Sequence, residues 1–407
     1  MCTVAKHRTR NEQASGMARR HEDEGQYAEQ DIAEGHGRKL PDCPGRCKGA
    51  VRGWGDNWTT RGSRLTVKGL TQRKGATPAP RWFSLSIYPS MTIPHKVRIG
   101  AVAWGAYVLF LVTDMPSHHW TGALLLLSAL VLMPMAWCLA RDLDDTGWAA
   151  KLWRFDLQLQ LPAALLLIPA FWLTPGWSAL LCALPWACVL GVMAVDGLLR
   201  IRRHGFTPLG PLCRDVGLIY ASVGGIWLLL ERSGWQTPEL SSGLFAHQAV
   251  HFHYFGFVLP LVAGLAQNRR AQCPIGTTAT VLVIIGVPLV ALATVVAEFW
   301  PIDLLKSLAT WLLVVGGVGV AWQHIVLAVQ ERTVHPLARA LWLVAGIALA
   351  TGMLLAGLHA SRLVLPPLPW LDLPWMLALH GTLNALGFSL AAVLAWCRAG
   401  RECCCGR

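Results

Sequence analysis

The sequence is poor in charge, since only 14% of its 407 residues are Asp, Glu, Lys or Arg while 54% are hydrophobic. Soluble domains contain about 25% charged residues, so this composition excludes an ordinary soluble protein. The chain also lacks an HExxH zinc motif, a nucleophile elbow and a Ser-His-Asp order, which removes the familiar hydrolase signatures. None of its 12 cysteines has paired CxxC spacing, so no zinc-finger framework is expected.

Long apolar runs dominate the chain instead. A membrane-spanning helix needs about 20 mostly apolar residues, and ten segments meet or approach that length. They lie at 98–115, 120–139, 157–174, 177–198, 214–230, 247–266, 277–297, 305–328, 338–358 and 374–397. The sequence therefore predicts an all-α fold, a polytopic transmembrane bundle of about ten helices whose first partner is the lipid bilayer.

The distribution of Lys and Arg predicts the orientation of this bundle, because cytoplasmic loops are enriched in both residues. Alternate loops carry 11 of them against three in the other loops, so both termini are expected in the cytoplasm. The 11 are Arg141, Lys151, Arg154, Arg200, Arg202, Arg203, Arg214, Arg269, Arg270, Arg332 and Arg339.

Residues 1–90 differ from the rest of the chain, with 16 Lys and Arg against 9 Asp and Glu and no hydrophobic periodicity. They read as a disordered basic tail, or as the product of a start codon placed upstream of Met91, which opens directly into the first apolar run. Residues 91–398 form the expected transmembrane domain, and 399–407 a Cys-rich cytoplasmic tail. The basic tail lacks interleaved aromatic residues, so nucleic acid is not an expected partner; protein partners are unknown.

The segment 247–266 contains an unusual group of polar residues for hydrocarbon, where titratable side chains are costly and usually functional. His247 and His251 are four residues apart and share a helix face with Tyr254. His253 is turned by about 200° from His251. One helix cannot present all three histidines to one ligand, so a site would have to form between helices.

The last apolar segment offers such a partner. His380 and Asn384 share a face there, at roughly the depth of the histidines in 247–266. With the predicted orientation, both groups lie in the extracytoplasmic half of the membrane. Further polar residues are expected at or near that layer, namely His118, His119, His359, Glu231 and Glu298.

Three interpretations of this histidine cluster stay open. In the first, His247, His251, His253, Tyr254, His380 and Asn384 bind a cofactor. A transition metal held by His247, His251 and His380, or a haem, would then form a redox site. In the second, the same residues titrate in a proton-coupled transporter of small solutes. In the third, they only join helices by hydrogen bonds in a structural or partner-binding protein.

Other signals are weaker. Aligning Gly256-Phe257 with Gly387-Phe388 pairs His253 with Asn384 at an offset of 131 residues, a faint internal echo whose ordinary explanation is a small-residue contact beside an aromatic ring. No paired set of broken helices and no intramembrane carboxylate stands out, because Asp196 and Asp215 lie toward helix ends. His324 is expected at a membrane interface.

Two motifs, His251-Phe-His-Tyr-Phe-Gly-Phe257 and His380-Gly-Thr-Leu-Asn-Ala-Leu-Gly-Phe388, resemble the YndJ-like family of bacterial integral membrane proteins. The resemblance extends from about Met91 to Cys397. It implies a multi-pass protein of the bacterial inner membrane, and it brings no activity or catalytic residues to transfer. Position 255 departs from the motif, since Phe255 stands where a small residue is expected.

Overall fold

The computed structural model describes most of the chain after Met91. The described residues are 92–111, 117–141, 148–236, 240, 243–300, 302–362 and 376–400. All of them belong to one of the two units into which the chain divides, Trp82–Arg407. The predicted tail 1–90 and the cysteines at 403–405 lie outside the described residues, so their predicted roles stay predictions.

The described residues form ten helices of membrane length and contain no strand. We call the second, sixth and tenth of these span 2, span 6 and span 10. The ten are α2 (Ile93–Leu111), span 2 (α3, Ser117–Leu127, η1, Ser128–Leu132, and α4, Met133–Ala140), α5 with α6 (Trp148–Leu165 and Leu167–Trp172), α7 (Trp177–His204), α8 (Leu209–Ser233), span 6 (α9, Leu244–His251, η2, Phe252–Val258, and α10, Leu259–Arg269), α11 (Pro274–Phe299), α12 (Asp303–Gln330), α13 (Pro336–Ser361) and span 10 (η3, Met376–Gly381, η4, Leu383–Leu390, and α15, Ala391–Ala399).

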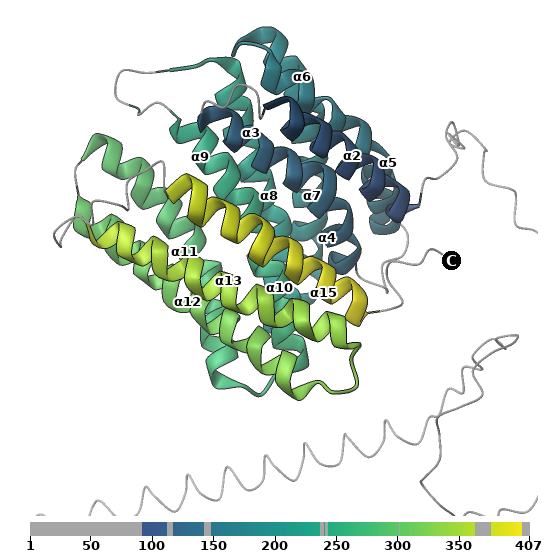
Figure 1. Ribbon diagram of the computed structural model, residues 1–407, viewed down its shortest axis with the longest axis vertical. Helices are drawn as coiled ribbons and strands as arrows, with labels where there is room; N and C mark the ends of the chain where they lie inside the picture. Colours follow the sequence, from purple (N-terminus) through teal and green to yellow (C-terminus); the bar gives the residue numbers. More distant parts are fainter. Residues whose placement is uncertain are drawn as a thin grey trace, which may run out of the picture. The chain divides into compact units, whose positions relative to one another are not determined.

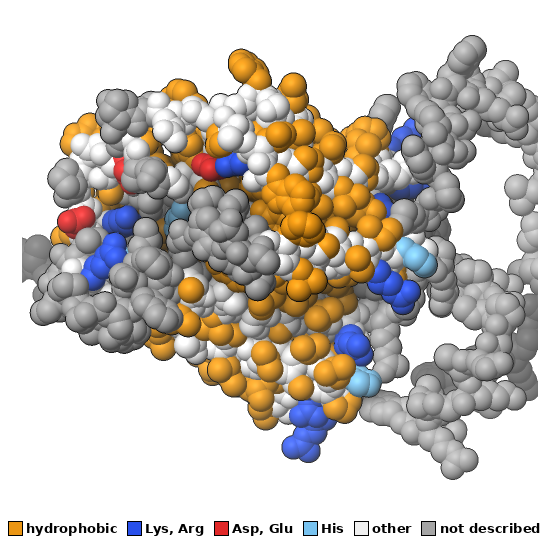
Figure 2. Space-filling model, turned by 45° about the horizontal axis from the view of Figure 1, so that its top comes forward, with side chains coloured by type: hydrophobic (Ala, Val, Ile, Leu, Met, Phe, Trp, Pro, Cys, Tyr) orange, Lys and Arg blue, Asp and Glu red, His pale blue; other side chains and the backbone are white. Residues whose placement is uncertain are grey.

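Nine of these described helices are long and apolar enough to cross a membrane. The tenth, α2, is 19 residues long and less apolar because His95, Lys96 and Arg98 occupy its first turns. The predicted all-α, multi-pass transmembrane bundle of about ten helices is confirmed. Figure 2 shows one face of the protein, where hydrophobic side chains cover much of the described surface, as a lipid-facing protein requires.

Glycine ends two of the long helices. α7 and α8 are followed by Gly205 and Gly234 with φ of +73° and +74°, a left-handed conformation that costs glycine little. Thr174-Pro-Gly connects α6 to α7, and the amide of Gly176 donates a hydrogen bond to the carbonyl of Arg232 (2.8 Å). This bond joins the start of α7 to the end of α8.

Spans 2 and 6 lie at the centre of the bundle. Within the most apolar stretch of each, all residues of span 2 and 83% of those of span 6 are buried, against 33–56% for the other described spans. Span 10 packs against both, α2 and α5 to α8 form one neighbouring group, and α11 to α13 form another (Figure 1). In the predicted histidine cluster, the residues from span 6 therefore belong to an inner helix, and those from span 10 belong to a helix packed against it.

Spans 2, 6 and 10 each contain π-helical segments, whose backbone hydrogen bonds run from residue i to i+5. Such segments are rare and are frequent at functional sites. η2 and η4 begin 131 residues apart, at Phe252 and Leu383, and pack against each other. Both helices continue through these segments, as Leu244–Arg269 and Ala378–Ala399, so the pair consists of π segments inside unbroken helices.

The described helices after span 2 divide into two sets of four. The first repeat contains α5 with α6, α7, α8 and span 6, and the second contains α11, α12, α13 and span 10. α7 and α12 each have 28 residues, while α8 has 25 and α13 has 26. In both repeats the second and third helices form an extensive pair, and the third packs against the π-containing fourth. The two sets of four helices thus share their order and the packing of their second, third and fourth helices, in line with the faint echo in the sequence.

Candidate functional site

The ring of Phe255 packs against both of the histidines that the sequence assigned to one site. Its centroid is 5.3 Å from that of His251 and 5.8 Å from that of His380, against which it stacks. Phe255 belongs to η2 and His380 to η3, so this contact joins spans 6 and 10. The departure from the motif at position 255 therefore supplies an aromatic ring that contacts both imidazoles.

His251 has a buried ring nitrogen, Nε2, with no hydrogen-bond partner. A second aromatic neighbour, Phe252, packs edge-on against its ring. A buried polar atom without a partner is uncommon in folded proteins and calls for an explanation. This nitrogen is available to take up a proton or to bind a ligand.

His253 is fully occupied by protein partners. Its Nδ1 donates to the carbonyl of Ala249 (2.7 Å), and its Nε2 accepts from the indole of Trp186 in α7 (3.1 Å). As the sequence predicted, His253 faces away from His251; it lies against α8, where a β-carbon on Gly224 would be 2.8 Å from Nδ1. Both nitrogens are used, so His253 orders the core around the site.

His324 repeats this arrangement in the second half of the chain. Its Nδ1 donates to the carbonyl of Val320 (2.9 Å), and its Nε2 accepts from the indole of Trp396 in α15 (3.2 Å). The expectation that His324 is an interface residue was wrong, because its side chain is fully buried. The tryptophan that satisfies it lies 72 positions away in the sequence.

Trp186→Phe is expected to destabilise the folded protein by about 1–3 kcal/mol, because it leaves the buried Nε2 of His253 without a donor. Trp177→Phe is the matched control in the same helix, since Trp177 is 81% exposed. Thermal unfolding of both variants in detergent checks this expectation. An equal change in the two would show that the indole–imidazole bond contributes nothing.

Asn384 and His380 form a hydrogen-bonded pair, and the backbone contact of Asn384 corresponds to that of His253. The amide of Asn384 donates to the carbonyl of His380 (2.8 Å), four residues earlier, just as His253 donates to Ala249. Nδ1 of His380 in turn donates to the carbonyl of Gly352 in α13 (2.8 Å). Because Nδ1 carries the proton, Nε2 of His380 keeps its lone pair.

In each repeat a glycine leaves room for one of the two equivalent side chains, His253 and Asn384. A β-carbon on Gly352 would lie 2.4 Å from Nδ2 of Asn384, as one on Gly224 would meet His253. Gly224 lies in α8 and Gly352 in α13, the third helices of their repeats. The equivalence of His253 and Asn384 that the sequence suggested is therefore matched by their surroundings.

The other predicted site residues are dispersed. The hydroxyl of Tyr254 donates to the carbonyl of Leu124 in span 2 (2.7 Å). His247 is exposed at the start of α9. Glu231 pairs with Arg232 (2.7 Å), and His359 lies beside Arg362 (3.3 Å). The side chains of His118 and His119 lie outside the described part of the structure.

These positions bear on the proposed metal or haem. In the described part of the chain, no three His, Cys, Asp or Glu side chains are placed so that they could hold one metal ion. The ring of Phe255 packs against both His251 and His380, beside the two imidazoles where a haem would need room for its own ring. The metal site of His247, His251 and His380 stays a prediction, and in this arrangement the residues do not fit either group.

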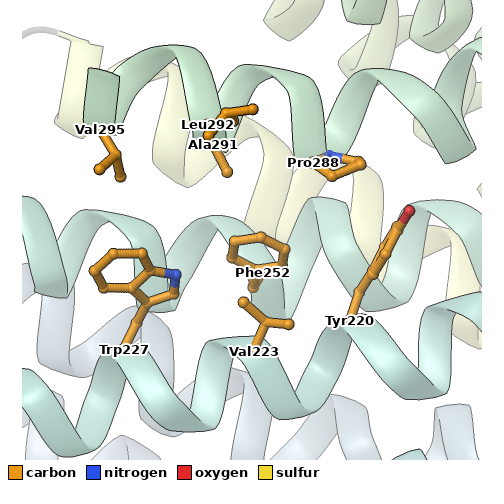
Figure 3. A pocket seen from close by; sticks show the side chains of 8 residues that line it. All are labelled: Tyr220, Val223, Trp227, Phe252, Pro288, Ala291, Leu292 and Val295. Carbon is orange, nitrogen blue, oxygen red and sulfur yellow. The ribbon is translucent and has the colours of Figure 1, made fainter. Parts of the chain in front are cut away.

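A groove of about 350 Å³ lies nearby, between α8 and α11. Figure 3 shows Phe252 of η2 pointing into it, between Trp227 and Tyr220 of α8 on one side and Pro288 of α11 on the other. The hydroxyl of Tyr220 donates to the carbonyl of Ile284 (2.7 Å). The groove is almost wholly apolar, so it adds no ionisable group to the site.

Buried carboxylates form a second group that the sequence did not predict. Asp156, Asp196 and Asp215 are only 3%, 6% and 1% exposed. Asp196 and Asp215 lie toward helix ends, as expected, and Asp156 is a residue that the sequence did not single out. The third span was predicted to begin at 157, but α5 begins at Trp148 and carries Asp156 well inside the helix.

One signal in the sequence could have revealed this group. Asp196 and Arg200 are four residues apart in an apolar helix, the spacing of an ion pair, and they meet at 2.6 Å. The side chain of Arg200 also donates to the carbonyl of Ala140, at the end of span 2 (2.8 Å). A buried arginine thus joins α7 to the central helix.

A comparison with known proteins places the chain in a family. No curated protein and no solved structure matches it. The model of one family, described as YndJ-like protein, matches residues 123–388, from span 2 to the end of the η4 motif at Phe388. This region holds the first repeat, the second repeat up to Phe388 in span 10, and both histidine motifs. The chain belongs to the YndJ-like family of multi-pass membrane proteins.

Proposed function

We propose that this protein is a proton-coupled transporter of small solutes, in which His251 and His380 take up and release the proton. Transporters are commonly built from structural repeats, with substrate and ion sites near the membrane midplane where the repeats meet. Here the two four-helix repeats meet at η2 and η4. The contact between these two equivalent π segments is the observation that carries the proposal.

The residues at this contact have the chemistry that proton transfer needs. Histidine changes charge close to neutral pH and commonly serves as a proton shuttle. The imidazoles of His251, with its unpartnered Nε2, and of His380, with its lone pair on Nε2, both pack against the ring of Phe255. Movement of this ring would join or separate the two imidazoles, which is what a proton gate requires.

The orientation predicted from Lys and Arg gives the proposed proton path a direction across the membrane. It places His247, exposed at the start of α9, on the extracytoplasmic side, with His251 one turn deeper. Protons would therefore enter at His247 and pass inward to His251. The bacterial inner membrane, which maintains a proton gradient, is the location that we propose for the protein.

The test uses the purified protein in liposomes. A pH jump applied to these liposomes on a solid-supported membrane is expected to give a transient current that His251→Gln/His380→Gln removes. His204→Gln, an exposed histidine at the far end of α7, is expected to leave the current unchanged. A panel of amino acids, sugars, carboxylates and inorganic cations is then added to the liposomes, one solute at a time. The transported solute is the one whose addition replaces the transient current with a sustained uptake of protons.

Three outcomes would overturn the proposal. The first is a wild-type current no larger than that of empty liposomes, and the second is a double variant that keeps the full current. Failure of every solute in the panel to produce uptake is the third, and it would favour a structural or partner-binding role. Stoichiometric metal that the double variant loses would favour the redox interpretation.

A further inference from the structure

We infer that Asp156 is a second proton-binding residue of this protein, buried in the half of the bundle opposite the histidines. The inference rests on the proposed function, because it adds a second proton-binding residue to the same proton path. Asp156 lies well inside α5 with 3% of its surface exposed, and its Oδ1 is buried with no hydrogen-bond partner. An ionised carboxylate in this position would be unpaired in a water-poor interior.

The groups around Asp156 do not neutralise it. From α7 comes Asp196, which is close enough for its negative charge to act on Asp156. Asp196 already binds Arg200 through Oδ2, and its own Oδ1 is also buried without a partner. From α2 comes Lys96, whose ammonium donates to the carbonyl of Leu157.

The remaining contacts of α5 add no cation. η1 supplies only Ser128 and apolar residues, and Gln160 of α5 donates to the carbonyl of Ala129 there (2.7 Å). Arg214 of α8 binds its neighbour Asp215 (3.2 Å). Among the described residues, no Lys, Arg or His forms a salt bridge with Asp156.

The ion pairs in this group leave Asp156 as the carboxylate without a salt-bridge partner. Asp196 is matched by Arg200 and Asp215 by Arg214, while the third cation, Lys96, binds the backbone carbonyl of Leu157. An unpaired buried charge is strongly disfavoured, and such a group takes a proton instead. Carboxylates inside membrane proteins recur in proton relays for this reason.

The second repeat has no counterpart of this group. α11 and the described part of α12 after Lys306 contain no buried Asp, Lys or Arg. The first repeat therefore holds the carboxylate and the second holds His380. A carrier that moves a proton across the membrane needs groups that bind it on both sides of its midplane, and these two repeats supply one each.

Infrared spectroscopy of the protein in lipid at neutral pH tests the inference. The difference spectrum of wild type minus Asp156→Asn is expected to contain the carbonyl stretch of a protonated carboxylic acid. Asp303→Asn, an exposed carboxylate at the start of α12, is expected to give no such band. Asn has the shape of a protonated Asp, so the variant is also expected to unfold at the wild-type temperature or above it.

A second variant keeps the inference testable if Asp156→Asn does not fold. In protein labelled with 13C-aspartate, Asp156→Glu is expected to move the carbonyl band of the protonated acid to the frequency of an unlabelled carboxylic acid. A difference spectrum without the band would overturn the inference, even where the liposome assay succeeds. The proposed function fails separately, when wild-type liposomes show no current although the band is present.

Discussion

Gly100→Ala is expected to lower the unfolding temperature of the protein by several degrees. A β-carbon on Gly100 would lie 2.1 Å from the carbonyl oxygen of Leu130, in the π segment of span 2. That neighbour is backbone and cannot turn aside, so α2 must move away from the central helix. Overpacking of this kind costs about 1–3 kcal/mol and occasionally more, which outweighs the gain of about 1 kcal/mol from alanine in a helix.

The matched control lies five residues further along the same helix. A β-carbon on Gly105 would meet nothing within 4 Å. Gly105→Ala should therefore keep the helical gain and unfold at the wild-type temperature or slightly higher. Thermal unfolding followed by circular dichroism in detergent compares the two. Equal behaviour of the variants would contradict the close packing of α2 on η1.

Arg200→Met is expected to destabilise the protein by about 3–5 kcal/mol, the cost of removing one partner of a buried ion pair. Arg200 is 1% exposed and holds both Asp196 and the carbonyl of Ala140. Methionine fills a similar volume, so the loss is chiefly electrostatic. Asp196 is left as a second buried carboxylate without a cation.

A double variant separates this effect from a packing defect. Asp196→Asn/Arg200→Met removes the stranded charge and is expected to recover a large part of the lost stability. Arg203→Met, at an exposed position in the same helix, should change the free energy of unfolding by no more than about 0.5 kcal/mol. If Arg200→Met costs no more than Arg203→Met, the ion pair does not stabilise the bundle.

The sequence was sufficient for the architecture, because apolar runs of membrane length follow directly from the thickness of the bilayer. It also separated His253 from His251, since that depends only on helical rotation. The partner of His253 could not be predicted: Trp186 lies 67 positions earlier, and its indole is one of 20 in the chain. Long-range pairing of this kind is decided by how the helices pack.

The π segments could not be predicted from the sequence for a related reason. Rules of helical spacing assume a constant number of residues per turn, and η2 breaks that assumption directly after His251. The burial of Asp156 was not predicted because the third span was predicted to start at 157. The stretch before that position is polar, and hydropathy alone assigns it to a loop. The burial of this carboxylate depends on α7 and α2, which cover the first turns of α5.

The π segment in span 6 also has a mechanical consequence. If η2 changed to ordinary α-helix, the residues on one side of it would turn by about one helical step, or about 100°, relative to those on the other. His251 would then swing away from Phe255 while α10 kept its place against α8. The same change would turn the side chains of α9 toward different neighbouring helices, so η2 can act as a swivel that changes the surroundings of His251 while the α10 half of span 6 stays in place.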